Sequence, residues 1–105
     1  MDLDQLARAL DAFKALEAAQ LPAHHIRLFI EIAQHGPITY RELEDRLLTT
    51  NASISRGVQA LSDNRIDGRP GLGLVSTYSD PDEGRRLLVK LSKRGHLVKA
   101  QLQAL

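Results

Sequence analysis

The spacing of apolar residues changes near residue 74, and this change limits the folds open to the chain. Before that point, apolar residues recur every three or four positions, which is the pattern of amphipathic helices. Between residues 74 and 91 they alternate with other residues on both sides of the turn-forming stretch "SDPDEG". After Ser92 the helical spacing returns. The pattern therefore predicts a mainly α-helical chain with one small β-hairpin, an α+β fold.

Four helices are predicted before the hairpin. The first covers "LDQLARALDAFKALEAA", and the second covers "LPAHHIRLFIEIAQHG", with a proline in its first turn and a glycine at its end. The third begins at about Thr39, which has the spacing of a capping box with Glu42. Ile38 is expected to pack on Leu43 as a hydrophobic staple. The buried face of the second helix is expected to contain Ile26, Phe29, Ile30 and Ala33.

The fourth predicted helix has two contrasting faces and is capped by Thr50. One stripe is apolar and contains Ile54, Val58 and Leu61. The opposite side carries Ser55, Arg56 and Gln59, and Gly57 and Ala60 are expected to keep its flanks thin. Such polar side chains form hydrogen bonds with base edges and phosphates. The third and fourth helices are therefore interpreted as a helix-turn-helix.

The predicted hairpin follows the helix-turn-helix in the sequence. Its second strand is expected to turn Leu87, Val89 and Leu91 inward and Arg86 and Lys90 outward. A helix-turn-helix followed by a hairpin predicts a winged helix-turn-helix, and Ser92 is expected to cap one more helix after it. The predicted core is Ile26, Phe29, Ile30, Leu43, Leu47, Ile54, Val58, Leu61, Leu87, Val89 and Leu91.

Length and composition favour one domain without cofactors. The 105 residues are divided into an N-terminal dimerisation helix (1–20), a winged helix-turn-helix (21–91) and a C-terminal helix (92–105). Cysteine is absent and the four histidines are poorly spaced as ligands, so no metal site is expected. No stretch approaches the roughly 20 apolar residues of a membrane span, and the start is acidic where a signal peptide would be basic. A cytoplasmic protein that does not contact membranes is predicted.

Two stretches resemble the MarR (multiple antibiotic resistance regulator) family of winged-helix transcription factors. They are "ASISRGVQAL", which is similar to the family's recognition helix, and "SDPDEGRRLLVKLSKRG", which is similar to its wing and the start of the next helix. The resemblance runs from about Leu21 to Gly95. It implies a homodimer that binds a roughly palindromic operator. It also implies that a wing-tip arginine enters the minor groove, and Arg85 takes that place with Arg86 close behind.

This chain also departs from the family pattern. Residues 66–71 are expected to form an extra loop of unassigned role, and the chain ends about thirteen residues after Ser92, where family members continue into longer dimerisation helices. Family members often release DNA when a small ligand binds. A small-molecule effector is left open here, because the sequence offers no convergent polar cluster for one.

The predicted function is that of a sequence-specific regulator of transcription, a repressor, that binds double-stranded DNA. The recognition helix is expected in the major groove and the wing in the minor groove. The predicted DNA-binding residues are Thr39, Arg41, Thr50, Asn51, Ser53, Ser55, Arg56, Gln59, Arg85 and Arg86. An alternative for the two wing arginines is that they only form surface salt bridges with Asp80, Asp82 or Glu83.

Apolar stripes at both ends of the chain predict the homodimer independently. The predicted interface residues are Leu3, Leu6, Leu10, Phe13, Leu97, Leu102 and Leu105. The alternative is that the first stripe belongs to the core of a single chain.

Other functions receive less support from the sequence. The chain lacks a cysteine nucleophile, a "G-x-S-x-G" motif and a phosphate-binding glycine loop, so an enzyme is not predicted. Its few aromatic residues argue against RNA binding by base stacking. The remaining rival is a winged helix that contacts another protein, as an adaptor or an antagonist of a regulator. A net charge of only +1 keeps this rival open.

Overall fold

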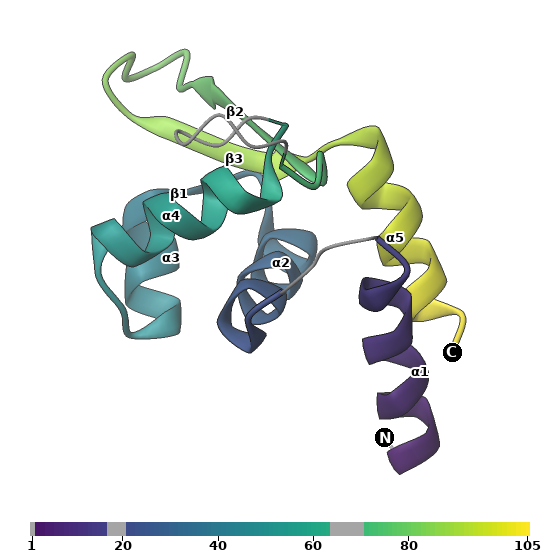
Figure 1. Cartoon of the computed structure of the whole chain (residues 1–105). Helices are drawn as coiled ribbons and strands as arrows, with labels where there is room; N and C mark the ends of the chain where they lie inside the picture. The colour runs from purple at the N-terminus through teal and green to yellow at the C-terminus, as the bar shows by residue number, and fades with distance from the viewer. Residues whose placement is uncertain (1, 17–20, 64–70) are drawn as a thin grey trace.

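The computed structural model describes residues 2–16, 21–63 and 71–105, and it has the predicted α+β fold. In chain order the elements are α1 (Leu3–Lys14), α2 (Ala23–His35), β1 (Ile38–Thr39), α3 (Tyr40–Leu47), α4 (Asn51–Leu61), β2 (Val75–Ser79), β3 (Leu87–Leu91) and α5 (Lys93–Gln103). Figure 1 shows α4 and the β2–β3 hairpin on the opposite side of the molecule from α1 and α5. The extra loop expected at residues 66–71 lies, apart from Gly71, outside the described residues.

The hairpin is confirmed, and it belongs to a larger sheet than the sequence indicated. The three strands are antiparallel in the order β1-β3-β2, with Val75 opposite Leu91 and Ser79 opposite Leu87. Ile38, which is expected to staple the start of α3, also lies in β1 opposite Val89, and both Ile38 and Leu43 are buried in the core. A strand of two residues is too short to show an alternating pattern, so only the partner strand defines it.

The helix starts follow the predicted capping residues closely. The hydroxyl groups of Thr39, Thr50 and Ser92 accept hydrogen bonds from the backbone N–H three residues further on, at 3.1, 3.2 and 3.0 Å. At α1, Asp2 and Gln5 form a full capping box that was not predicted. Each cap satisfies an N–H that the helix itself leaves unpaired.

The core differs from the predicted one along α2. Leu28 and Ile32 are fully buried there, whereas Ile26 and Ile30 are only half-buried. The reason is that α2 packs against α4, α3, β3 and α5, so its buried face is wider than one stripe. Leu87 was also expected in the core, but it is exposed at the outer end of the hairpin.

Gly57 is buried between α2 and α4, although it was predicted on the flank of the exposed face, as was Ala60, which is buried too. A Cβ atom on Gly57 would lie 2.5 Å from Cδ2 of Leu28 and 3.4 Å from the His25 ring. Glycine therefore allows α4 to approach α2 closely. This contact sets the distance between α2 and α4, and so the position of the exposed side of α4.

The first helix joins the core through its last turn. Phe13 is 3% exposed and meets Phe29 edge to face, with ring centroids 5.6 Å apart. The earlier turns of α1 lie alongside α5, as Figure 1 shows. Phe13 therefore belongs to the core of the single chain, as the alternative for this stripe proposed, and is not available to a second copy.

Candidate nucleic-acid interface

The exposed side of α4 carries the polar residues that were predicted to contact DNA. Asn51 and Arg56 are exposed, and Ser53, Ser55 and Gln59 are half-buried along the same helix. Thr50 is exposed too, but its hydroxyl accepts from the Ser53 N–H as the helix cap. The outer side of the helix thus carries amides, hydroxyl groups and a guanidinium, while Ile54, Val58 and Leu61 anchor the helix in the core.

The turn before α4 has a left-handed residue. Leu48 ends α3 with φ of 52°, and its side chain is 91% exposed. The Glu44 carbonyl closes the turn by accepting from the N–H groups of Leu48 and Thr49. A side chain with Cβ is disfavoured in this backbone conformation, so the turn holds a small amount of strain.

The two predicted DNA-binding residues at the start of α3 differ in exposure. Thr39 is buried, and its hydroxyl both accepts from the Glu42 N–H and donates to the Glu42 carboxylate at 3.0 Å. Its polar atoms are therefore used within the protein. Arg41, the second residue of α3, is exposed.

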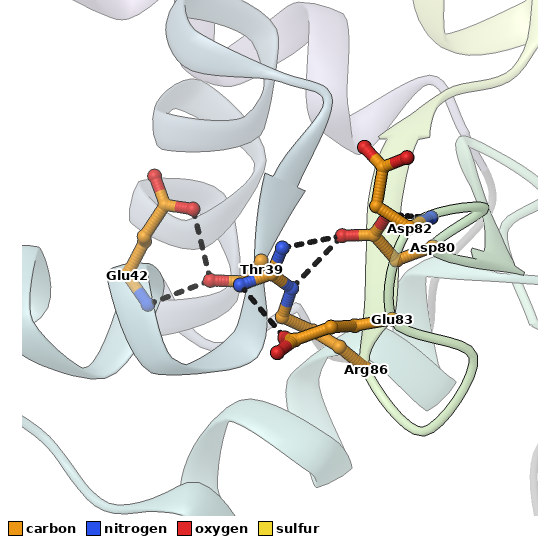
Figure 2. Close-up of polar contacts among 6 residues, drawn as sticks. All are labelled: Thr39, Glu42, Asp80, Asp82, Glu83 and Arg86. Carbon is orange, nitrogen blue, oxygen red and sulfur yellow. Dashed lines mark hydrogen bonds and ion pairs between the residues drawn. The ribbon is translucent and has the colours of Figure 1, made fainter.

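The wing turn is built around Asp80, whose side chain is 8% exposed. Its Oδ1 accepts from the Asp82 N–H at 2.9 Å, and its Oδ2 accepts from Nε and Nη2 of Arg86 at 2.9 and 2.6 Å. Arg86 also lies 3.3 Å from the Glu83 carboxylate. Figure 2 shows the Arg86 guanidinium between these acids and the Thr39–Glu42 cap of α3.

These contacts shift the ionisation of both partners. The Asp82 N–H and the Arg86 guanidinium hold the pKa of Asp80 below its ordinary value. The hydrogen bond to Asp80 raises the pKa of Arg86, with smaller contributions from Glu83 and Glu42. The charges of Asp80 and Arg86 therefore stabilise each other and fix the shape of the turn.

The two wing arginines have different surroundings. Arg86 is engaged with Asp80 and Glu83, as the salt-bridge alternative proposed for both. Arg85 is exposed, and its side chain forms no hydrogen bond or ion pair with any residue in the described ranges. Only Arg85 is thus left with a free guanidinium at the wing.

A second charged cluster, which was not predicted, connects α2 to the helix-turn-helix. The Glu31 side chain is 5% exposed and lies 2.8 Å from Arg27, 3.2 Å from His35 and 3.5 Å from Arg46. Arg27 and His35 are one helical turn away in α2, and this spacing was visible in the sequence. Arg46 comes from α3, so the cluster ties α2 to the first helix of the helix-turn-helix.

The predicted dimerisation residues are placed unevenly. Leu3 and Leu97 are 82% and 61% exposed. Leu6, Leu10 and Leu105 are exposed as well, whereas Leu102 packs partly against the core. Because α1 and α5 lie side by side, their exposed leucines belong to one end of the molecule.

The described residues contain neither a group of metal ligands nor a membrane-spanning helix. In residues 2–16, 21–63 and 71–105, no group of three or more potential ligand residues could hold a metal ion. None of the helices in these ranges is long and apolar enough to cross a membrane.

Comparison of the sequence with protein-family models and with curated proteins finds no match. Comparison of the structure does find similar proteins. A probable transcriptional regulator from Pseudomonas aeruginosa is 26% identical, with a TM-score of 0.67 over 96% of this chain and 70% of that chain. The transcriptional regulator Tm0710 from Thermotoga maritima is 15% identical, with a TM-score of 0.73 over 96% of this chain and 63% of that chain.

A third similar structure is a mutant of MarR from E. coli complexed with operator DNA. It is 21% identical, with a TM-score of 0.66 over 95% of this chain and 66% of that chain. Across the solved structures compared, this chain spans 61% to 76% of their lengths. The chain has the winged-helix fold of the MarR transcriptional regulators, and the predicted resemblance to that family is confirmed at the level of the fold.

Proposed function

We propose that this protein is a regulator of transcription that binds double-stranded DNA sequence-specifically and acts as a repressor in the cytoplasm. The observation that carries the proposal is the free Arg85 at the wing, together with the polar exposed side of α4. Helix α4 and the β2–β3 hairpin, whose turn contains Arg85, lie on the side of the molecule away from α1 and α5 (Figure 1). In this arrangement α4 enters the major groove and Arg85 the adjacent minor groove, where negative potential attracts guanidinium groups.

The similar structures support this proposal. The Pseudomonas aeruginosa neighbour is described as a probable transcriptional regulator, and the E. coli MarR structure contains operator DNA. Neither is an enzyme by its description, in agreement with the sequence-based prediction against catalysis.

The exposed leucines of α1 and α5 support a homodimer as the DNA-binding species. Leu3, Leu6, Leu10, Leu97 and Leu105 form an apolar surface at one end of the molecule. In a two-fold dimer, the apolar surface of one copy would pack against the same surface of the other. Such a dimer would bind a roughly palindromic site. Light scattering at micromolar concentration tests this, and a monomeric full-length protein would contradict it.

The decisive experiment compares two substitutions on specific and random DNA. Arg56→Ala removes a major-groove contact, so it should cost on the order of 1–3 kcal/mol on a specific site and less on random DNA. Arg85→Ala should lower the affinity for specific DNA and for random DNA by more similar amounts than Arg56→Ala does. If the two variants bind both DNAs like the parent, helix and wing are not a DNA-binding surface.

The second candidate function, contact with another protein, is favoured by one observation. The exposed side of α3 carries Glu42 and Asp45 beside Arg41, and the net charge of the chain is only +1. Strong DNA-binding proteins usually show a clearer basic surface. A titration of the parent on random DNA at low salt separates the candidates, because no binding there favours the protein partner.

A further inference from the structure

Asn51, the first residue of α4, is held by a side chain from the helix before it. Its Nδ2 atom donates a hydrogen bond to Oε2 of Glu44 at 3.3 Å across the α3–α4 turn. Asn51 is exposed, and Glu44 is half-buried in the last turn of α3. The backbone carbonyl of Glu44 closes the same turn, so this side chain starts from a well-defined position.

This contact selects one of the two orientations of the asparagine amide. A carboxylate only accepts hydrogen bonds, so the NH₂ group of Asn51 has to face Glu44. With the amide turned over, Oδ1 would face the carboxylate and the hydrogen bond would be lost. The selected orientation leaves Oδ1 and the second N–H of Asn51 available to a ligand.

The available pair matches one base. Asparagine recognises adenine in the major groove by accepting from N6 through Oδ1 and donating to N7 through Nδ2. The first residues of a recognition helix are those that reach base edges. Asn51 occupies that place and needs only one of its two amide hydrogens for Glu44.

Glu44 is otherwise unfavourable where it stands. A carboxylate in the last turn of a helix opposes the helix dipole, and a negative charge beside the recognition helix repels phosphates. The next residue, Asp45, is exposed and forms no hydrogen bond or ion pair with any part of the chain that the structure describes. Asp45 therefore provides the same charge without the contact to Asn51.

We propose that Glu44 is a positioning residue for sequence discrimination, and that it orients Asn51 to recognise an adenine in the major groove. The inference rests on the proposed DNA-binding function and names one base that the site selects. Glu44 itself touches no DNA in this account. It acts only through the Asn51 amide.

The test measures two quantities for the full chain, namely base preference in a selection from a randomised duplex library and affinity for random DNA. Asn51→Ala should remove the preference for adenine at one position of each half-site, a loss of about 5- to 100-fold. Glu44→Ala frees the amide to turn over, so that preference should fall by about 2-fold or more. Affinity for random DNA should rise in the same variant, because a negative charge is gone.

Asp45→Ala is the matched control. It should raise affinity for random DNA in the same way and leave the adenine preference unchanged. Damage to the fold would lower both quantities, so a rise in one with a fall in the other is specific to positioning. Binding with unchanged base preference in either Asn51→Ala or Glu44→Ala overturns this inference alone. A parent protein that binds no DNA at low salt overturns the proposed function as well.

Discussion

Two nearly buried carboxylates, Glu31 and Asp80, support different parts of the molecule. Their side chains are 5% and 8% exposed, and each is bound by arginine. Asp80 takes all its partners from within six residues, so it shapes one turn of the wing. Glu31 has a partner fifteen residues away in α3, so it joins two helices. One carboxylate therefore controls local geometry and the other controls packing between elements.

The largest expected effect comes from removing the carboxylate that joins the helices. Glu31→Ala leaves Arg27, His35 and Arg46 without their common partner and should lower the free energy of unfolding by about 1–3 kcal/mol. Urea denaturation measures this loss. Asp45→Ala, which removes an exposed acid from α3, should change the free energy of unfolding by less than about 0.5 kcal/mol. Equal urea midpoints for the two variants would contradict the role given to Glu31.

Substituting the two wing arginines separates shape from binding. Arg86→Ala should loosen the hairpin, seen as faster amide exchange in residues 79–87, because Asp80 loses its charged partner. Arg85→Ala should leave amide exchange unchanged and reduce the slope of DNA affinity against salt by about 1. If Arg85→Ala loosens the hairpin as much as Arg86→Ala does, the division between the two arginines is wrong.

Acid should weaken the Asp80 turn in a defined direction. Because the pKa of Asp80 is lowered in the folded state, its ionised form adds stability above the ordinary value of 3.8. This contribution is lost as the pH falls below that value through the folded-state pKa. The difference in melting temperature between the parent and Asp80→Asn should therefore be full at pH 6 and shrink below about pH 3.8. A difference that stays constant down to pH 2.5 would contradict the assignment.

The α3–α4 turn has no buried carboxylate, and it is expected to give the smallest effect. Leu48→Gly relieves the left-handed backbone but adds freedom to the unfolded chain, so a net gain of about 0.5–1 kcal/mol is expected. Leu48→Ala removes the exposed side chain without relieving the backbone and should give no gain. Thermal unfolding of both variants decides this, and equal melting temperatures would show that the turn holds no strain.

The parts of the fold that were predicted correctly depend on neighbouring residues. Thr39, Thr50 and Ser92 cap helices through a contact three residues away, and the hairpin shows its own alternation. The parts that were missed depend on distant partners. Strand β1 exists because Ile38 pairs with Val89. The position of Phe13 on an apolar stripe does not show whether it packs in the core of its own chain or against a second copy, and the structure places it against Phe29.

The same distinction applies to the candidate site. The exposed residues of α4 followed from helical spacing, but adjacent arginines in a wing gave no indication of which one pairs with acids. The structure pairs Arg86 with Asp80, and Arg85 has no hydrogen bond or ion pair with the described part of the chain. Part of the Glu31 cluster was visible as a four-residue spacing with Arg27 and His35, whereas Arg46 joins it only through packing.

The edge-to-face contact of Phe13 with Phe29 ties α1 to the core, in addition to the packing of α1 along α5. The last turn of α1 is anchored in the core, while its first residue, Leu3, is one of the most exposed large apolar residues that the structure describes. Phe29 belongs to α2, and α2 also holds α4 at the close contact with Gly57. The Phe13–Phe29 contact and the close approach of Leu28 to Gly57 therefore connect α1 to α4 through α2. A partner that tilts α1 would have to change the packing of Phe13 against Phe29 in the core.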